Sequence, residues 1–314
     1  MFQQIVDAKN RLKGVAHQTP ILSSRTLNKM IGAQVYFKCE NFQRIGAFKF
    51  RGAFNCISQL TQAQQKRGVI AFSSGNHAQA VALVSKLLGI KATIIMPSNT
   101  PQVKLDATRG YGAQIVIYDI ETENREEVTA KIQNKYGYTL IAPFNNTHVI
   151  AGQGTVAYEF LEKVPDLNSL LVPCGGGGLL AGSAIAAKGL NSNIRVIGVE
   201  PELADDAKQS FESGKIVTIP VSKTIADGTR TTALGHMTFP FIQQYVDEIC
   251  TTTEQAIIEA VKFHLLRMKI VVEPSGALGL AALLSKTVKA EGKIGIIISG
   301  GNIDPPILQG ILGE

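Results

Sequence analysis

The 314-residue sequence has no tryptophan, only four cysteines, no run of like charges and no apolar run long enough to cross a membrane. The cysteines lie far apart, which argues against a zinc cluster and a disulfide framework: Cys39, Cys56, Cys174 and Cys250. The 31 Lys and Arg residues are dispersed and leave a net charge of only +6. Because no basic stretch is interleaved with aromatics, we expect no nucleic-acid partner and no membrane partner. A small molecule is the expected partner.

A hydrophobic share of 45% and a charged share of 18% are typical of a soluble globular protein. The length suits two compact domains, which need not be contiguous in sequence. The segment 1–14 carries charged residues where a signal peptide would have its apolar core. We therefore expect a cytoplasmic protein.

Short β-branched apolar runs alternate with longer helical stretches, which is the pattern of parallel strands joined by crossover helices. Their continuous apolarity predicts sheets covered on both faces. The predicted strands are 34–38, 68–73, 91–96, 113–118, 139–143, 169–174, 195–200 and 293–299. A helix is predicted over 76–88, ending at Gly89. Pro101 is predicted as the first residue of a second helix, and Thr253 as the N-cap of a third. Ligands of such sheets bind at the carboxyl ends of strands, so the turns there are the candidate sites.

The turn GGGGLLAG, at 175–182, follows one predicted strand and precedes a helical segment. Its glycines leave backbone N–H groups free to surround an anion, and the helix start adds a positive dipole end, so a phosphate seat is predicted. The same turn has a second interpretation. Gly176, Gly178 and Ala181 match a dinucleotide-binding pattern, and Glu200 ends the next strand about where a ribose-binding acid would stand. An NAD(P)-dependent dehydrogenase is therefore an alternative from glycine spacing alone, although it leaves two other turns unexplained.

Those two turns carry hydroxyl groups. SSGNH, at 73–77, has hydroxyls, an amide and backbone donors that suit capture of a carboxylate, with one serine left as a proton carrier. Serine and asparagine also form such turns simply as N-caps, and taken alone His77 is a structural histidine. SGGN, at 299–302, places another hydroxyl and bare backbone after a strand.

Lys49 stands between Phe48 and Phe50 in the stretch AFKFRGAFN. Apolar surroundings disfavour an ammonium ion and lower the pKa of a lysine, although this stretch alone also fits a solvent-facing lysine on a helix. A desolvated amine is a nucleophile that forms a Schiff base with an aldehyde. Together with a phosphate seat, the amine points to an aldehyde that carries a phosphate, which is pyridoxal phosphate.

An ordered set of segments resembles the fold-type-II pyridoxal-phosphate enzymes of the serine/threonine dehydratase and serine racemase group, in the serine racemase and threo-3-hydroxyaspartate dehydratase-like branch. The segments are HQTPILSS, KCENFQRIGAFKFRGA, SSGNHAQA, VIAGQGT, PCGGGGLLAG, VEP with ADD, IADG, EPSGALG and SGGNID. The resemblance implies a two-domain α/β fold like that of tryptophan synthase β, with parallel-rich sheets flanked by helices. A large domain of 1–66 and 146–314 would surround a small domain of 67–145, with the cofactor in the cleft between them.

The resemblance also implies roles for residues at the cofactor. Lys49 would be the Schiff-base lysine and a base, and Ser74 the acid or base on the opposite face. Phe48 would pack near the ring, Asn76 would bond its phenolic oxygen and Ser299 would meet the pyridine nitrogen. The phosphate would be held by Gly175, Gly176, Gly177 and Gly178, and the substrate by Ser73, Ser74, Gly75, Asn76 and His77.

The implied reaction is β-elimination of water and ammonia from a β-hydroxy-α-amino acid such as serine, threonine or threo-3-hydroxyaspartate, with racemisation if Ser74 returns the α-proton. Ser299 cannot hold the pyridine nitrogen protonated as a carboxylate would, which favours elimination over transamination. Ala47 stands where many dehydratases have Ser or Thr, which argues against a plain threonine dehydratase. A second substrate carboxylate would meet Arg125 or Arg230. A non-catalytic, regulatory protein that binds the cofactor is a further alternative.

The stretch GVEPELADD resembles the divalent-cation site of the same branch, with carboxylates from Glu200 and Asp206 and the carbonyl of Ala204. Such oxygen ligands suit Mg²⁺, Mn²⁺ or Ca²⁺. Two exposed acids beside a helix start are the alternative. A weaker match implies ATP as an activator, and the family implies a homodimer. The residues that match the nucleotide site by type are Gln79, Tyr111, Lys269 and Asn302.

Overall fold

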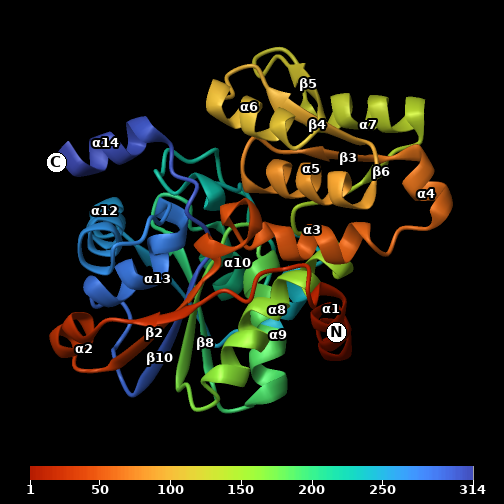
Figure 1. Cartoon of the computed structure of the whole chain (residues 1–314). Helices are drawn as coiled ribbons and strands as arrows, with labels where there is room; N and C mark the ends of the chain where they lie inside the picture. Colours follow the sequence, from red (N-terminus) through yellow and green to blue (C-terminus); the bar gives the residue numbers. More distant parts are fainter. Residues whose placement is uncertain (314) are drawn as a thin grey trace.

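The computed structural model describes residues 1–313, which form two sheets flanked by helices (Figure 1). In the six-stranded sheet, β1 pairs antiparallel with β2 and the other neighbours are parallel. Its strands in spatial order are β1 (Ile21–Ser23), β2 (Gln34–Cys39), β10 (Lys293–Ile298), β7 (Ser169–Pro173), β8 (Arg195–Pro201) and β9 (Glu248–Thr252). The predicted α/β class with parallel-rich sheets is confirmed.

The second sheet has four parallel strands. In spatial order they are β5 (Gln114–Tyr118), β4 (Ala92–Pro97), β3 (Val69–Phe72) and β6 (Thr139–Leu140). All of them lie within 69–140, inside the segment expected to form the small domain. The division into a large domain of 1–66 and 146–314 around a small domain of 67–145 stays a prediction.

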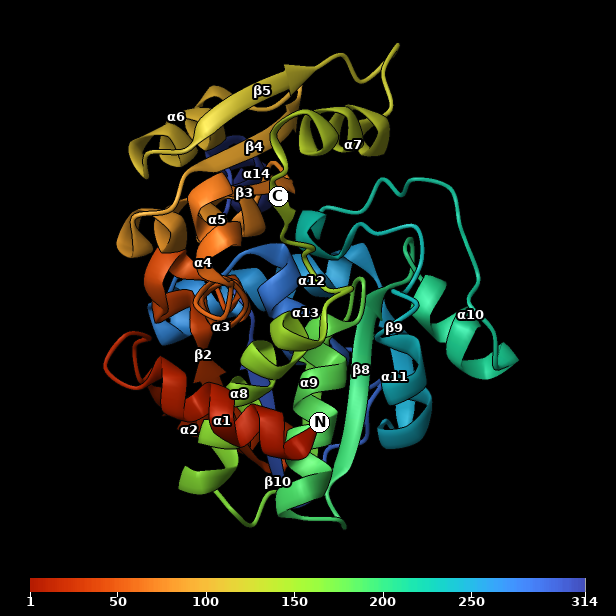
Figure 2. The ribbon, with the colours of Figure 1, turned by 90° about the vertical axis from the view of Figure 1, so that its right-hand side faces the viewer.

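Helices cover both faces of the six-stranded sheet. The helices that follow one another along the chain are α1 (Phe2–Leu12), α2 (Arg25–Ile31), α3 (Lys49–Ile57), α4 (Gln62–Arg67), α5 (Asn76–Leu88), α6 (Gln102–Gly110), α7 (Arg125–Tyr136), α8 (Thr147–Lys163), α9 (Gly178–Leu190), α10 (Asp206–Ser213), α11 (Phe239–Tyr245), α12 (Glu254–Phe263), α13 (Pro274–Leu284) and α14 (Pro305–Gly313). Helices α1, α8 and α9 pack together, as do α12 and α13 (Figure 2). No helix within residues 1–313 is long and apolar enough to span a membrane.

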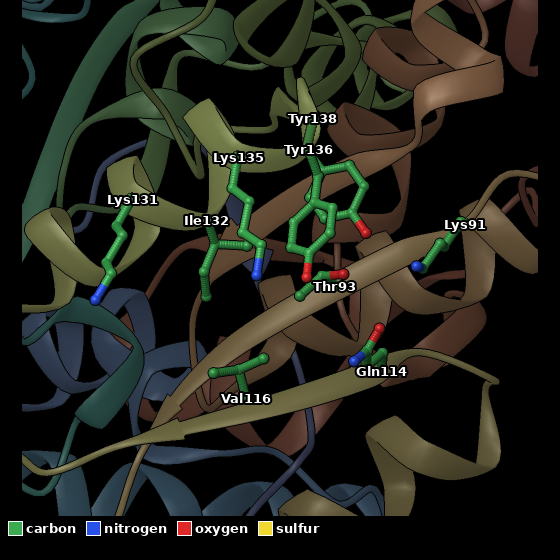
Figure 3. A pocket seen from close by; sticks show the side chains of 9 residues that line it. All are labelled: Lys91, Thr93, Gln114, Val116, Lys131, Ile132, Lys135, Tyr136 and Tyr138. Atoms are coloured by element: carbon green, nitrogen blue, oxygen red, sulfur yellow. The ribbon is translucent and has the colours of Figure 1, made fainter.

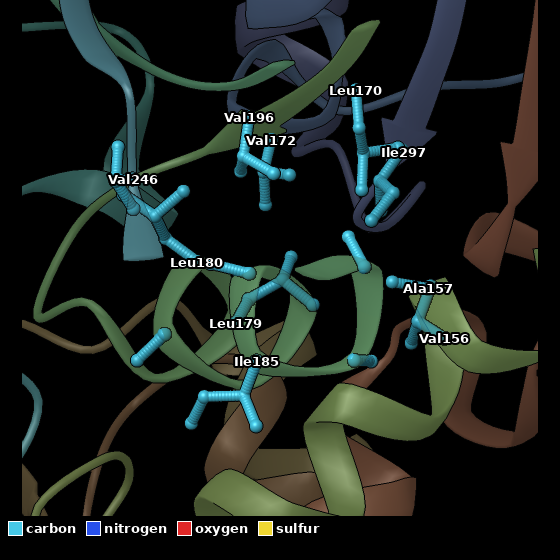
Figure 4. Packing of buried hydrophobic residues seen from close by; sticks show 14 of the residues in the cluster. Val156, Ala157, Leu170, Val172, Leu179, Leu180, Ile185, Val196, Val246 and Ile297 are labelled. Atoms are coloured by element: carbon cyan, nitrogen blue, oxygen red, sulfur yellow. The ribbon is translucent and has the colours of Figure 1, made fainter. Parts of the chain in front are cut away.

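The strands of the large sheet send alternate side chains to two separate cores. Leu170 and Val172 of β7 belong to one cluster with Leu180 and Ile185 of α9 (Figure 4), whereas Leu171 belongs to the cluster on the α13 side. Alternation in a strand sends successive side chains to opposite faces, so an apolar residue at every position is buried on one face or the other. This explains why the strand at 169–173 could be predicted from a continuous apolar run.

Several helix ends follow the local signals. Gly89 closes α5 in the left-handed conformation, with φ 67°, and the Thr253 side chain accepts a hydrogen bond from the N–H of Ala256 at the start of α12. Pro101 was expected as a first helical residue. It is instead the N-cap, with ψ 139°, and α6 begins one residue later.

A buried charged network, called here the Arg51 network, fixes the first turns of α3. Arg51 is fully buried and donates to both carboxylate oxygens of Glu40, at 2.8 and 2.9 Å, and to both of Glu159, at 2.7 and 2.8 Å. Lys38 adds an ion pair with Glu159 at 3.0 Å, and Thr19 donates to Glu40. These partners come from β2, α8, the turn after β2 and the segment before β1, so the network ties the first turn of α3 to segments remote in sequence.

Candidate active site

Lys49 is the first residue of α3 and is not solvent-facing. Its Nζ donates to the carbonyl oxygen of Pro143 at 3.1 Å and lies 5.1 Å from the centroid of the Phe48 ring. Burial lowers the pKa of Lys49 from 10.5 to about 8, although the nearby Glu273 carboxylate opposes the shift. A lysine with this pKa is partly a free amine at neutral pH and is suited to attack an aldehyde.

The glycine turn lies between β7 and α9, and side chains cannot be added to it without collision. A Cβ on Gly176 would stand 2.3 Å from the Phe144 ring, and one on Gly178 would stand 2.4 Å from the side-chain oxygen of Gln153. Within residues 1–313, no acceptor is found for the N–H groups of Gly175, Gly176 and Gly177. Bare backbone donors at a helix N-terminus fit a phosphate group.

Lys49 and the glycine turn meet at the segment that follows β6. Pro143 accepts from Lys49, and also from the side chain of Gln153 at 3.2 Å, while the adjacent Phe144 covers Gly176. The fold therefore brings the amine and the candidate phosphate seat to one place.

The turn after β10 also reaches this place. Ser299 is buried, and its carbonyl oxygen accepts from the N–H of Phe48 at 3.0 Å. Ala47 forms an isolated β-bridge with Gly300. The Ser299 hydroxyl is thus held beside the segment that carries Lys49.

Asn76 opens α5 and connects the second and third turns. Its side-chain nitrogen donates to Glu273 at 2.8 Å, and its oxygen accepts from Asn302 at 2.7 Å. Burial raises the pKa of Glu273 from 4.5 to about 8. The side chain of Glu273 is therefore a proton-bearing group near neutral pH, held against a residue expected to bind the cofactor.

Glu273 and Phe144 are site residues to which the sequence reasoning gave no role. Glu273 lies in the segment EPSGALG and directly precedes the apolar helix α13. A single acidic residue at the start of an apolar helix could have indicated a site residue. Phe144 carried no such signal, because its contact with Gly176 joins segments far apart in sequence.

The turn 73–77 leaves β3 and enters α5. Ser73 accepts from the N–H of Gly75 at 3.2 Å, Ser74 is half-buried, and a Cβ on Gly75 would meet nothing within 4 Å. The open space at Gly75 is where a substrate could lie. His77 is buried, and its Nε2 bonds to the carbonyl oxygen of Ile141 at 2.8 Å. Burial, together with the charge of Lys49, lowers the pKa of His77 to about 3, so the ring is neutral.

The arginines expected to meet a second carboxylate lie on exposed segments. Arg125 is the first residue of α7 and pairs with Glu126 at 2.7 Å. Its guanidinium lies 5.1 Å from the ring centroid of Phe72, the residue that precedes Ser73. Arg230 is exposed and follows Thr229, whose Cα would touch a Cβ on Gly175. Both arginines border the site, and their roles stay predictions.

Three of the four residues matched to a nucleotide site have partly or fully exposed side chains. Gln79 and Tyr111 are half-buried on the surfaces of α5 and α6, and Lys269 is exposed with a left-handed φ of 63°. Asn302 is different, because it bonds Asn76 and the carbonyl oxygen of Ile45.

Glu200 and Asp206 are both fully buried, so their reading as exposed acids is wrong. Glu200 accepts from the N–H groups of Ala207 and Lys208, while neither carboxylate oxygen of Asp206 has a partner among the residues described. Burial raises the pKa of Glu200 well above 4.5 and that of Asp206 to about 7. Ala204, whose carbonyl was the third expected ligand, is also buried. Within residues 1–313, no group of three or more His, Cys, Asp or Glu side chains forms a metal cluster.

The amine, the bare glycine turn and the neutral hydroxyl lie together on an α/β fold, and their chemistry fits pyridoxal phosphate. Comparison with known families agrees: residues 12–300 match the family described as pyridoxal-phosphate dependent enzyme, and the chain belongs to it. The predicted resemblance is thereby confirmed. Membership favours this cofactor over the dinucleotide alternative for the glycine turn.

Similar proteins with stated activities indicate which reactions within this family are relevant. The chain is 52% identical over 304 residues to L-threo-3-hydroxyaspartate ammonia-lyase of Saccharomyces cerevisiae, covering 96% of this chain and 93% of that protein. It is also 52% identical to serine racemase of Schizosaccharomyces pombe, covering 96% and 94%. The structure of maize serine racemase superposes with a TM-score of 0.95 at 44% identity, covering 99% of this chain and 96% of that one. These relatives are ammonia-lyases and serine racemases, and this chain is an enzyme of the serine/threonine dehydratase class.

Proposed function

We propose that this enzyme removes water and ammonia from a β-hydroxy-α-amino acid and also racemises serine. The observation that carries the proposal is the Lys49 amine, whose pKa burial lowers to about 8, beside bare N–H groups and a neutral hydroxyl. Serine, threonine and threo-3-hydroxyaspartate are the candidate substrates, supported by the names of the relatives. Bound pyridoxal phosphate supplies the electron sink for a negative charge at the α-carbon.

Lys49 would anchor the cofactor and take the α-proton, for which a near-neutral amine is well matched. The N–H groups of Gly175 to Gly178 would hold the phosphate, and Phe48 and Asn76 would flank the ring. Ser299 would leave the pyridine nitrogen unprotonated, because a hydroxyl has no negative charge to stabilise a cation.

The turn 73–77 would bind the substrate carboxylate through backbone donors at the start of α5. Ser74, half-buried and next to the open space at Gly75, would exchange a proton with the α-carbon on the face opposite Lys49. Return of a proton by Ser74 gives racemisation, and loss of the β-hydroxyl gives elimination.

The test is keto acid release from L-serine, L-threonine and L-threo-3-hydroxyaspartate by the holoenzyme, with D-serine measured in parallel. L-Alanine, which lacks a β-leaving group, is the control and should yield no keto acid. Release from none of the three hydroxyamino acids would contradict the proposal.

Replacing Arg125 with alanine should raise KM for threo-3-hydroxyaspartate about tenfold while leaving KM for serine unchanged, if this arginine meets the second carboxylate. Arg230→Ala is the matched comparison, since only one of the two should show the effect. Equal changes in KM for serine and for threo-3-hydroxyaspartate in both variants would show that neither arginine binds the second carboxylate.

A divalent cation, Mg²⁺, Mn²⁺ or Ca²⁺, is proposed at Glu200, Asp206 and the Ala204 carbonyl. Two buried carboxylates, one with no hydrogen-bond partner, fit a hard cation held by oxygen ligands. Adding the cation should raise the melting temperature, and Asp206→Asn should abolish that rise whereas Glu202→Gln, an exposed acid in the same loop, should not. Because Asp206 must be deprotonated to bind, the rise should fade as pH drops below about 7. A rise in Asp206→Asn equal to that of the parent would remove the site.

A homodimer, a cytoplasmic location and activation by ATP at Gln79, Tyr111, Lys269 and Asn302 are also proposed from the family resemblance. The bond from Asn302 to Asn76 supports the last of these, because it links this set to the cofactor site. An ATP titration that leaves the rate unchanged would remove the nucleotide role.

A further inference from the structure

A hollow of about 290 Å³ lies on the four-stranded sheet beside α7, away from the candidate active site (Figure 3). Its lining includes Lys91, Thr93, Gln114, Val116, Lys135 and Tyr138. The amino ends of β4 and β5 and the carboxyl end of α7 supply most of these residues. The turn 73–77 follows the carboxyl end of β3, at the opposite end of the same parallel sheet.

The charge of the hollow is positive, because three lysines line it and no acid does. Figure 3 shows Lys91 and Lys135 directed toward its centre, with Lys131 at its rim. Lys91 Nζ lies 5.6 Å from the ring centroid of Tyr138, and Lys135 Nζ lies 5.1 Å from that of Tyr136. Two ammonium groups that face one space without a carboxylate to neutralise them attract an anion.

The remaining lining is suited to a flat, weakly polar body. The rings of Tyr136 and Tyr138 stack with centroids 5.3 Å apart and planes at 22°, and Val116 and Ile132 add apolar surface. Tyr136 is 50% exposed, a larger exposed fraction than that of an aromatic residue that only fills a core.

Thr93 adds a polar group to the floor of the hollow. Its side chain is only 2% exposed, and its hydroxyl lies beside the Tyr138 hydroxyl, which also faces Lys91. A hydroxyl can donate one hydrogen bond and accept two, so this polar pair retains capacity for a ligand oxygen.

We propose that this hollow binds a small phosphate ester with a ring. Its phosphate lies between Lys91 and Lys135, near the Thr93 hydroxyl, and its ring lies against the tyrosine pair. The lysine ammonium groups act as point charges toward phosphate, and two of them match the charge of about −1.5 to −2 that a phosphate monoester carries near neutral pH. The inference does not depend on the reaction at Lys49.

The test is calorimetric titration of the holoenzyme, whose phosphate seat is filled, with phenyl phosphate, phenol and inorganic phosphate. Phenyl phosphate should bind most tightly, and K91A/K135A should weaken it at least tenfold. K66A/K86A removes two exposed lysines of the same region and should leave the affinity unchanged. Tyr136→Leu, at an exposed position, should weaken phenyl phosphate while leaving inorganic phosphate unaffected.

Three results would overturn the inference: no binding of phenyl phosphate, phenol binding as tightly as phenyl phosphate, or equal losses in the two double variants. The last would show a general field of positive charge rather than a site. Melting temperatures of the variants establish that each is folded, and Tyr136→Leu tests the ring contact independently of the lysines.

Discussion

Lys49→Ala should abolish the visible absorbance of the purified protein and reduce keto acid release by at least about a thousandfold, because the covalent anchor and the base are lost together. The change removes a partly buried amine whose only hydrogen bond is to the Pro143 carbonyl oxygen in the part of the chain described, so the fold should be retained. Absorbance from 300 to 500 nm and a keto acid assay with each hydroxyamino acid measure the two effects.

Lys163→Ala is the control, since Lys163 is exposed in the last turn of α8 and should behave as the parent protein does. A Lys49→Ala protein that still released keto acid at the parental rate would refute the role of this amine. Loss of absorbance with normal turnover would separate cofactor anchoring from catalysis and would contradict the combined role.

The positions of most strands could be predicted from the sequence, because these strands are buried on both faces and are therefore continuously apolar. All eight predicted strands are present, and most ends agree within one residue. The strand expected over 139–143 stops at Leu140, shortly before Pro143, which has no N–H to donate. The strands β1 and β9 were not predicted, because each lies at an edge of the large sheet and mixes polar with apolar residues. Edge strands need less apolar surface, so periodicity is a weak guide to them.

The site was predictable where local chemistry determines it and not where packing does. A glycine run after a strand is visible in the sequence, but the covering of Gly176 by Phe144 is not. The polar stretch at 200–208 fits a solvent-exposed loop, yet Glu200 and Asp206 are buried by segments remote in sequence. Burial of an acid depends on the whole fold, which is why the pKa values that distinguish these groups could not be expected from the stretch itself.

Arg51 lies two residues after Lys49 in the stretch AFKFRGAFN and is the centre of the Arg51 network. Arg51→Met should lower the free energy of unfolding by about 3–5 kcal/mol, because it leaves the buried carboxylate of Glu40 and the half-buried carboxylate of Glu159 without their bidentate partner. Methionine preserves most of the side-chain volume, so the loss would come from charge and not from a cavity. Urea unfolding of the two proteins measures the difference. Arg109→Met is the matched control, since its exposed pair with Asp106 should contribute no more than about 1 kcal/mol.

The pH dependence of stability provides a separate test of the same network. Burial raises the pKa of Glu159, but hydrogen bonds and charge from Arg51, with Lys38, outweigh burial and hold the pKa below 4.5. A carboxyl group with a lowered pKa in the folded state stabilises the fold above pH 4.5, and that contribution is lost as pH falls through the folded value. The parent protein should therefore lose stability steeply below pH 4.5, and Arg51→Met should lose less over the same range. Parallel curves for the two proteins would show that Arg51 does not hold Glu159 ionised, and restoration of stability by Glu40→Gln in the Arg51→Met background would identify the unpaired charge as the cause.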